Sequence, residues 1–192
     1  DYSERLEGPS WVEYQAIQKG GTPVAEIKEM HMSTASMEFG SILSHMNKKG
    51  KTTAGSYLEN HFDVPCSSLG IPIGVKATDL FFSLLERLTL KVIPEKYNRQ
   101  RGRLIDSYVD GNKYVSKKRA LVYGEEDFVV SMAGFLAEIG VIPVLCASGG
   151  KSKLFKQALE QILPENLKDQ VQVQEDMDFT RMEETAAAMP RD

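Results

Sequence analysis

Two aspartates have the spacing best suited to chemistry in this sequence. Asp106 and Asp110 lie four residues apart in the stretch RGRLIDSYVD. In a helix, both carboxylates leave one face about a turn apart, where like charges weaken the helix slightly. A hard cation such as Ca²⁺ accepts such oxygen ligands but takes about six to eight of them, so two make only part of a site. Arg101 and Arg103 are near enough in sequence to neutralise the acids instead. The spacing leaves a cation site and a solvated helix face open, and favours the solvated face.

A second candidate is the turn ASGGKSK, which follows an apolar strand pattern and precedes a helical one. Such a turn binds an anion when its backbone N–H groups and the following helix dipole face the ligand. It matches neither GxxxxGK[ST] nor GxGxxG, the two phosphate-binding patterns. We therefore favour a simple turn, with a surface anion site over Ser148 to Lys153 as the alternative.

The thiols and imidazoles form no recognisable catalytic set. Cys66 lies in a Pro/Gly-rich stretch, where a plain loop thiol is favoured over a cluster ligand. Cys146 is flanked by strand-forming apolar residues and is predicted to lie in the core. The three histidines, which show no metal-binding spacing, are predicted at the surface or at helix ends: His31, His45 and His61. The residues alone therefore indicate no catalytic and no cofactor-binding position.

Composition restricts the class of protein. The 192 residues are 42% hydrophobic and 26% charged, with a net charge of −4. This is typical of a globular chain, and the negative charge argues against broad nucleic-acid binding. No apolar run approaches the ~20 residues that a membrane helix requires. Two widely separated cysteines fit a reduced, cytoplasmic chain.

The ends of the chain predict an internal piece of a longer polypeptide. The sequence begins at Asp1 without methionine and ends within a helical pattern. Trp11 is expected to anchor the irregular opening stretch. Missing parts of the polypeptide can therefore carry the chemistry.

Periodicity predicts an α/β fold in two pieces. Apolar spacing favours strands at 36–44, 120–124, 141–148 and 170–174, and helices at 25–32, 52–62, 79–88, 94–116, 125–140, 149–164 and 178–189. Residues 66–77 are predicted to form a loop, with Thr78 and Asp79 beginning the next helix. The alternation after Lys117 is typical of a parallel βαβ unit. We expect Rossmann-like lobes: 1–93 as the end of one domain, 94–116 as a connecting helix, and 117–192 as the start of the next.

Four phrases together carry a family resemblance. Their order covers nearly all of Gly20 to Gly149: GGTPVAEIKEM, VPCSSLGIPIGVKATDLFFSLLERLT, PEKYNRQRGRLIDSYVD and KKRALVYGEEDFVVSMAGFLAEIGVIPVL. In this order they resemble the nitrogenase component 1 family, most closely its β-subunit type. The family's subunits each contain three Rossmann-like domains, so the chain would be less than half of one subunit.

The resemblance implies a structural role for the two aspartates. In the molybdenum type, two acids of the RGRL helix reach a metal ion between two β subunits, and Asp106 and Asp110 match their positions. The implied site is therefore an inter-subunit divalent cation without a catalytic role. The family often has a Ser/Thr-His pair after the second acid, whereas Gly111 and Asn112 follow here. This difference favours a related clade of the family over the molybdenum type itself.

The resemblance also implies which groups lie outside this chain. The P-cluster (8Fe-7S) is bound by cysteines of the absent N-terminal domain, and the molybdenum- or vanadium-iron cofactor by the α subunit. The expected partners are an α-type subunit, a second β subunit and the iron protein reductase. The expected activity of the full complex is reduction of N₂ to ammonia, with the isolated fragment inactive.

Three other functions remain open. A cofactor-assembly scaffold of the same family shares the fold and some phrases, and a related reductase acting on a tetrapyrrole or a sulfur compound is a further option. A metal or siderophore binding module also joins Rossmann-like lobes by a long helix, but it lacks the RGRL phrase.

Overall fold

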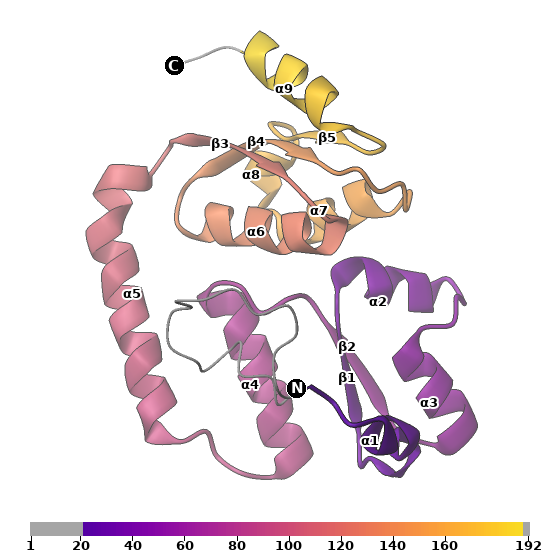
Figure 1. Cartoon of the computed structure of the whole chain (residues 1–192). Coiled ribbons are helices and arrows are strands. Elements are labelled where there is room, and N and C mark those ends of the chain that lie inside the picture. Colours follow the sequence, from indigo (N-terminus) through magenta and orange to yellow (C-terminus); the bar gives the residue numbers. More distant parts are fainter. Residues whose placement is uncertain (1–20, 190–192) are drawn as a thin grey trace, which may run out of the picture.

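The computed structural model describes residues 21–189, and Trp11 lies outside them. The chain folds into two α/β lobes connected along one side by a long helix (Figure 1). No helix between residues 21 and 189 is long and apolar enough to span a bilayer. The predicted α/β class with parallel sheets is confirmed. The domain boundaries after residues 93 and 116 stay a prediction.

The first lobe contains a two-stranded parallel sheet. Strand β1 (Ser36–Phe39) pairs with β2 (Cys66–Leu69), Ser36 lying opposite Cys66. Around and before these strands lie α1 (Val24–Lys28), the 3₁₀ helix η1 (Met30–Met32), α2 (Ser41–Lys48), α3 (Ala54–Phe62) and α4 (Val75–Thr89). Thr53 begins α3 with a capping box, in which its side chain accepts from the Ser56 amide and the Ser56 side chain accepts from the Thr53 amide.

Two predictions in this lobe are wrong. The expected strand at 36–44 ends at Phe39, because Gly40 has φ 149° and the chain turns into α2. The expected loop at 66–77 contains β2 and the start of α4. Pairing with β1 makes the short CSSL segment a strand, and this pairing depends on residues about 30 positions away.

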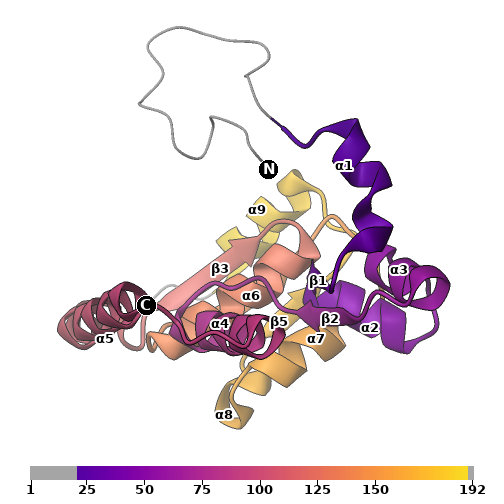
Figure 2. The same cartoon turned by 90° about the horizontal axis from the view of Figure 1, so that it is seen from below.

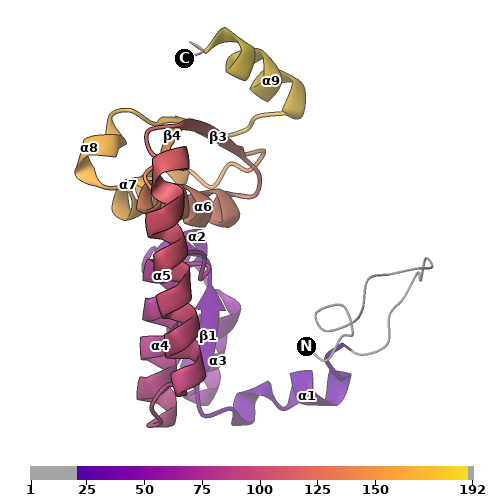
Figure 3. The same cartoon turned by 90° about the vertical axis from the view of Figure 1, so that its left-hand side faces the viewer.

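Helix α5 (Glu95–Val115) confirms the predicted long helix and links the lobes. Figure 3 views it along the side of the molecule, where it runs from the first lobe to the second. One edge of the helix contacts both lobes: the Tyr97 ring lies 5.5 Å from that of Phe82, and Tyr108 lies 6.1 Å from Phe135, centroid to centroid. No α5 residue is fully buried, so much of its surface faces away from the described chain.

The second lobe is a three-stranded parallel sheet in the order β3-β4-β5. The strands are β3 (Arg119–Tyr123), β4 (Ile142–Ala147) and β5 (Gln172–Gln174). Helices α6 (Glu126–Glu138), α7 (Phe155–Ile162) and α8 (Glu165–Lys168) cover one face, and α9 (Phe179–Ala188) lies on the other (Figure 1). The predicted βαβ unit is therefore confirmed, although α7 begins at Phe155, later than the predicted residue 149.

The main core lies between the three-stranded sheet and helices α6 and α7. Val129, Val130 and Phe155 are fully buried there, and Ile42 of α2 joins the same cluster from the first lobe. Cys146 also lies in this core, as predicted for a strand residue. The two lobes thus share apolar packing through α2, which lies beside α6 and α7.

Candidate functional site

The acidic turn of α5 is exposed, as its sequence predicts. Asp106 and Asp110 lie one helical turn apart, and both are exposed. Within residues 21–189 neither carboxylate has a hydrogen bond or an ion pair, and no group of three or more His, Cys, Asp and Glu residues is placed to hold a metal. A cation bound here would need its remaining ligands from outside residues 21–189.

Arg101 does not neutralise these acids. Its guanidinium donates two hydrogen bonds to Asp79 of α4, at 2.7 and 2.8 Å, and this pair raises the pKa of Arg101. Asp79 was expected to begin α4, but it lies in the second turn of that helix and binds α5 instead. The two aspartates are therefore left without this cation.

Apolar side chains accompany the aspartates on the surface of α5. Leu104 is 43% exposed, Val109 72% and Tyr114 66%. Exposed apolar groups beside unpaired acids are typical of a surface that another chain covers, since contact surfaces combine apolar area with a few polar groups.

The turn after β4 already has its anions within the chain. The Ser152 amide donates to Glu126 Oε1 at 3.1 Å, and the Lys153 amide donates to Glu175 Oε1 at 2.9 Å. A Cβ at Gly150 would lie 2.7 Å from the same Glu126 oxygen. The chain's own carboxylates fill the positions that a bound anion would take, so the simple-turn interpretation of Ser148 to Lys153 is favoured.

Neither cysteine has the environment of a cluster ligand. Cys66 begins β2 and is half-buried, and burial is the main cause that raises its thiol pKa, with the nearby Glu38 and Glu59 acting in the same direction. Burial in β4 raises the pKa of Cys146 to about 12. Iron–sulfur clusters are held by several thiolates, and these two protonated thiols lie in different lobes. This chain's residues therefore do not fit an iron–sulfur cluster.

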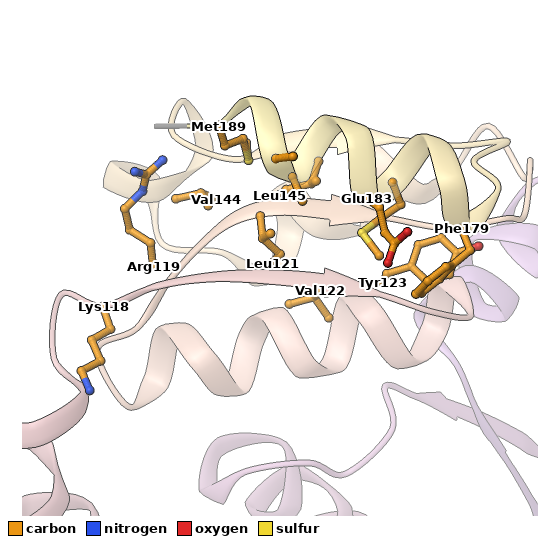
Figure 4. A pocket seen from close by; sticks show the side chains of 13 residues that line it. Lys118, Arg119, Leu121, Val122, Tyr123, Val144, Leu145, Phe179, Glu183 and Met189 are labelled. Carbon is orange, nitrogen blue, oxygen red and sulfur yellow. The ribbon is translucent and has the colours of Figure 1, made fainter. Parts of the chain in front are cut away.

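A cavity of about 780 Å³ lies between α9 and the sheet. Figure 4 shows Leu121 and Leu145 on the side of the cavity formed by the sheet, Lys118 and Arg119 at one end, and Phe179 and Glu183 at the other. The volume is typical of a ligand site, but such sites converge a few polar groups on one point. Here the charged groups lie at opposite ends, so the lining indicates a packing surface.

Helix α6 carries contacts that the sequence did not reveal. The Ile42 amide donates to Asp127 Oδ1 at 2.6 Å, and the Val75 and Lys76 amides donate to Glu138 at 2.8 and 3.1 Å. Carboxylates of the second lobe thereby cap the N-termini of α2 and α4 in the first lobe. These partners lie at least 62 residues apart in sequence, beyond any local capping pattern.

Comparison with known proteins identifies the family. The sequence profile of the family described as "Nitrogenase component 1 type Oxidoreductase" matches residues 4–192. The chain belongs to this nitrogenase component 1 family. The chain is 32% identical to a nitrogenase molybdenum-iron protein beta chain of Clostridium pasteurianum over 165 residues, 86% of this chain and 34% of the relative.

Other relatives agree. A nitrogenase vanadium-iron protein beta chain of Trichormus variabilis is 39% identical over 97 residues, 50% of this chain and 21% of the relative. A solved structure titled "Nitrogenase Cp1 at pH 6.5" superposes with a TM-score of 0.77 at 30% identity, covering 91% of this chain and 37% of that one. The chain thus spans between 21% and 37% of the length of these nitrogenase relatives. Its resemblance to β-type subunits is confirmed.

Proposed function

We propose that this chain is the part of a nitrogenase β-type subunit that provides scaffold and subunit interface. The observation that carries the proposal is the match of 86% of the chain to a molybdenum-iron protein beta chain and of 50% of the chain to a vanadium-iron protein beta chain. The parent complex would reduce N₂ in the cytoplasm with an α-type subunit, a second β subunit and an iron protein reductase. The P-cluster and the molybdenum- or vanadium-iron cofactor would be bound outside this chain, because its two cysteines do not fit a cluster. By itself the chain would be inactive.

The surface of α5 supports the interface part of the proposal. Asp106 and Asp110 would bind a divalent cation together with oxygen ligands of a second β subunit. Their exposure, their lack of a cationic partner within residues 21–189 and the exposed Val109 beside them fit a shared site. The cation would supply positive charge between two acidic surfaces and would take no part in the reaction.

The composition of the native complex tests the function. The full-length protein would be purified without oxygen, with its partner chain attached, and analysed for metals and sulfide. We expect iron and sulfide with molybdenum or vanadium, and reduction of N₂ and acetylene. Iron and sulfide without N₂ reduction would favour an assembly scaffold or a reductase of another substrate. Absence of iron would contradict the cluster-enzyme proposal and favour a binding module.

The double variant Asp106→Asn/Asp110→Asn tests the interface in the same complex. We expect analytical ultracentrifugation to show weaker association of the tetramer formed by α-type and β subunits. We also expect loss of a chelator-sensitive bound metal, with the iron–sulfur content kept. The double variant Asp169→Asn/Glu184→Gln is the matched control, because it removes two exposed negative charges elsewhere on the chain. Equal tetramer stability in both double variants would refute the shared cation site.

A further inference from the structure

An ion pair joins α5 to α4 shortly before the acidic turn of α5. The Arg101 guanidinium donates from Nε and Nη2 to the two carboxylate oxygens of Asp79, at 2.7 and 2.8 Å. Two parallel hydrogen bonds of this kind fix the orientation of both groups as well as their distance, because guanidinium and carboxylate are both planar. Figures 1 and 2 both show α4 between α5 and the β1-β2 sheet, so the pair connects α5 to the first lobe.

Stability alone does not account for this pair. The side chains of Arg101 and Asp79 are 48% and 41% exposed, and exposed ion pairs add little to the free energy of unfolding. Helix α5 has no fully buried residue, so apolar packing constrains its rotation about its own axis only weakly. A directional contact can set this rotation even where its contribution to stability is small.

Helix geometry relates Arg101 to the two aspartates. At 3.6 residues per turn, Asp110 lies roughly 180° around the helix from Arg101, and Asp106 roughly 140°. Because Arg101 binds α4, both carboxylates are turned away from the first lobe. Tyr97 and Tyr108 lie within roughly 40° of Arg101, and their rings contact aromatic rings of α4 and α6. One edge of α5 therefore binds the lobes, and the opposite edge presents the aspartates.

We propose that Arg101 and Asp79 form a positioning pair for the cation site of Asp106 and Asp110. This inference rests on the proposed function, in which the two aspartates share a divalent cation with a second β subunit. Ligands from both chains must reach such a cation at about 2.3–2.6 Å. By fixing the rotation of α5, the ion pair holds both carboxylates toward the second subunit.

A small rotation of α5 is enough to disturb the site. Side-chain atoms lie about 5–6 Å from a helix axis, so a rotation of about 10° moves them by about 1 Å. Metal–ligand distances vary by only about 0.2 Å. Loss of a residue that hydrogen-bonds a metal ligand directly costs about 10- to 100-fold in metal affinity. The Arg101–Asp79 pair acts through the helix, so we expect a smaller loss.

Binding of Mn²⁺ to the full-length protein in its native complex tests the proposal, after bound divalent metal is removed with a chelator. Free Mn²⁺ would be measured by its room-temperature EPR signal for the wild type, Arg101→Gln and Arg103→Gln. Arg103 is the matched control, because it is an exposed arginine of the same helix that does not bind Asp79. Both replacements remove one positive charge near the acids, which by electrostatics alone leaves the affinity for a cation unchanged or raises it.

We expect the Mn²⁺ affinity to fall about three- to tenfold in Arg101→Gln and to stay level or rise in Arg103→Gln. Hydrogen exchange of the α5 peptides should stay within about twofold of the wild type in both variants. Equal or higher Mn²⁺ affinity in Arg101→Gln would overturn the positioning role. Lost protection throughout α5 would also overturn it, because the weaker binding would then come from unfolding.

The double variant Asp106→Asn/Asp110→Asn separates this inference from the proposed function. Stronger Mn²⁺ binding by the wild type than by this double variant would support the shared cation site, whatever the result for Arg101→Gln. If the two bind Mn²⁺ equally, the cation site itself fails, and the positioning role fails with it.

Discussion

Asp127 of the second lobe caps the N-terminus of α2 in the first lobe, and its replacement tests this interlobe contact. Its Oδ1 accepts the Ile42 amide at 2.6 Å. Asp127→Ala removes this acceptor. Ile42 is 5% exposed, so its amide loses its partner without gaining water. An unsatisfied buried N–H costs about 1–3 kcal/mol, and loss of a helix cap about 0.5–2 kcal/mol.

A compensating term lowers this expectation. Burial, the largest cause, raises the pKa of Asp127, and the Glu125 and Glu126 charges act in the same direction. Desolvation and the neighbouring negative charges therefore destabilise the ionised carboxylate in the folded protein. Removing it relieves this destabilisation and offsets part of the lost capping energy. We expect a net loss of about 1–2 kcal/mol, which is roughly a 5- to 30-fold change in the local opening equilibrium.

Hydrogen exchange on the full-length protein measures this loss. Peptides that cover α2 should exchange roughly 5- to 30-fold faster in Asp127→Ala, while peptides of α3, capped within its own lobe by Thr53, should not change. Asp127→Asn keeps an acceptor for Ile42 and should lose less. Unchanged exchange in α2 of Asp127→Ala would refute the interlobe capping.

The pH dependence has a defined sign. Because the pKa of Asp127 is raised above the ordinary 3.8, the folded state binds this proton more tightly than the unfolded chain does. Stability from the protonated form is fully present below pH 3.8 and is lost as the pH rises through the folded pKa. The hydrogen-exchange protection of α2 in the wild type, divided by that in Asp127→Asn, should therefore fall or stay level from pH 5.5 to 7.5. An advantage that grows with pH would show a lowered pKa and contradict the burial argument.

Three further outcomes follow from the structure. Gly40→Ala should destabilise α2, because φ is 149° and the new Cβ would lie 2.5 Å from Asp127 Oδ2; the effect should shrink in the Asp127→Ala background, as a double-mutant cycle by hydrogen exchange would detect. Gly111→Ala should stabilise α5 by about 0.5–1 kcal/mol, because nothing lies within 4 Å of the added Cβ, and slower exchange of the α5 peptides would measure it. At pH 8 the raised pKa values should make Cys66 react with iodoacetamide more slowly than a free cysteine and leave Cys146 unreactive until the protein unfolds; rapid labelling of Cys146 in the native protein would contradict its burial.

Elements with local signals could be predicted from the residues alone. The long helix over α5 follows from its periodicity after Pro94, and the second lobe follows from alternating apolar strands and amphipathic helices. The spacing of Asp106 and Asp110 fixed their common face, since helix geometry alone decides it. The four family phrases indicated the nitrogenase component 1 family, because they preserve residue order over most of the chain.

Tertiary structure decided what depends on distant partners. Residues 66–69 form a strand only because β1 lies beside them, and α4 begins at Val75 because Glu138 receives its first amides. Arg101 binds Asp79, distant in sequence, in preference to the acids on its own helix. His45 is only 6% exposed because α2 packs against elements of both lobes. Hydrogen-bond partners and desolvation are set by the packed environment, which the local sequence does not contain.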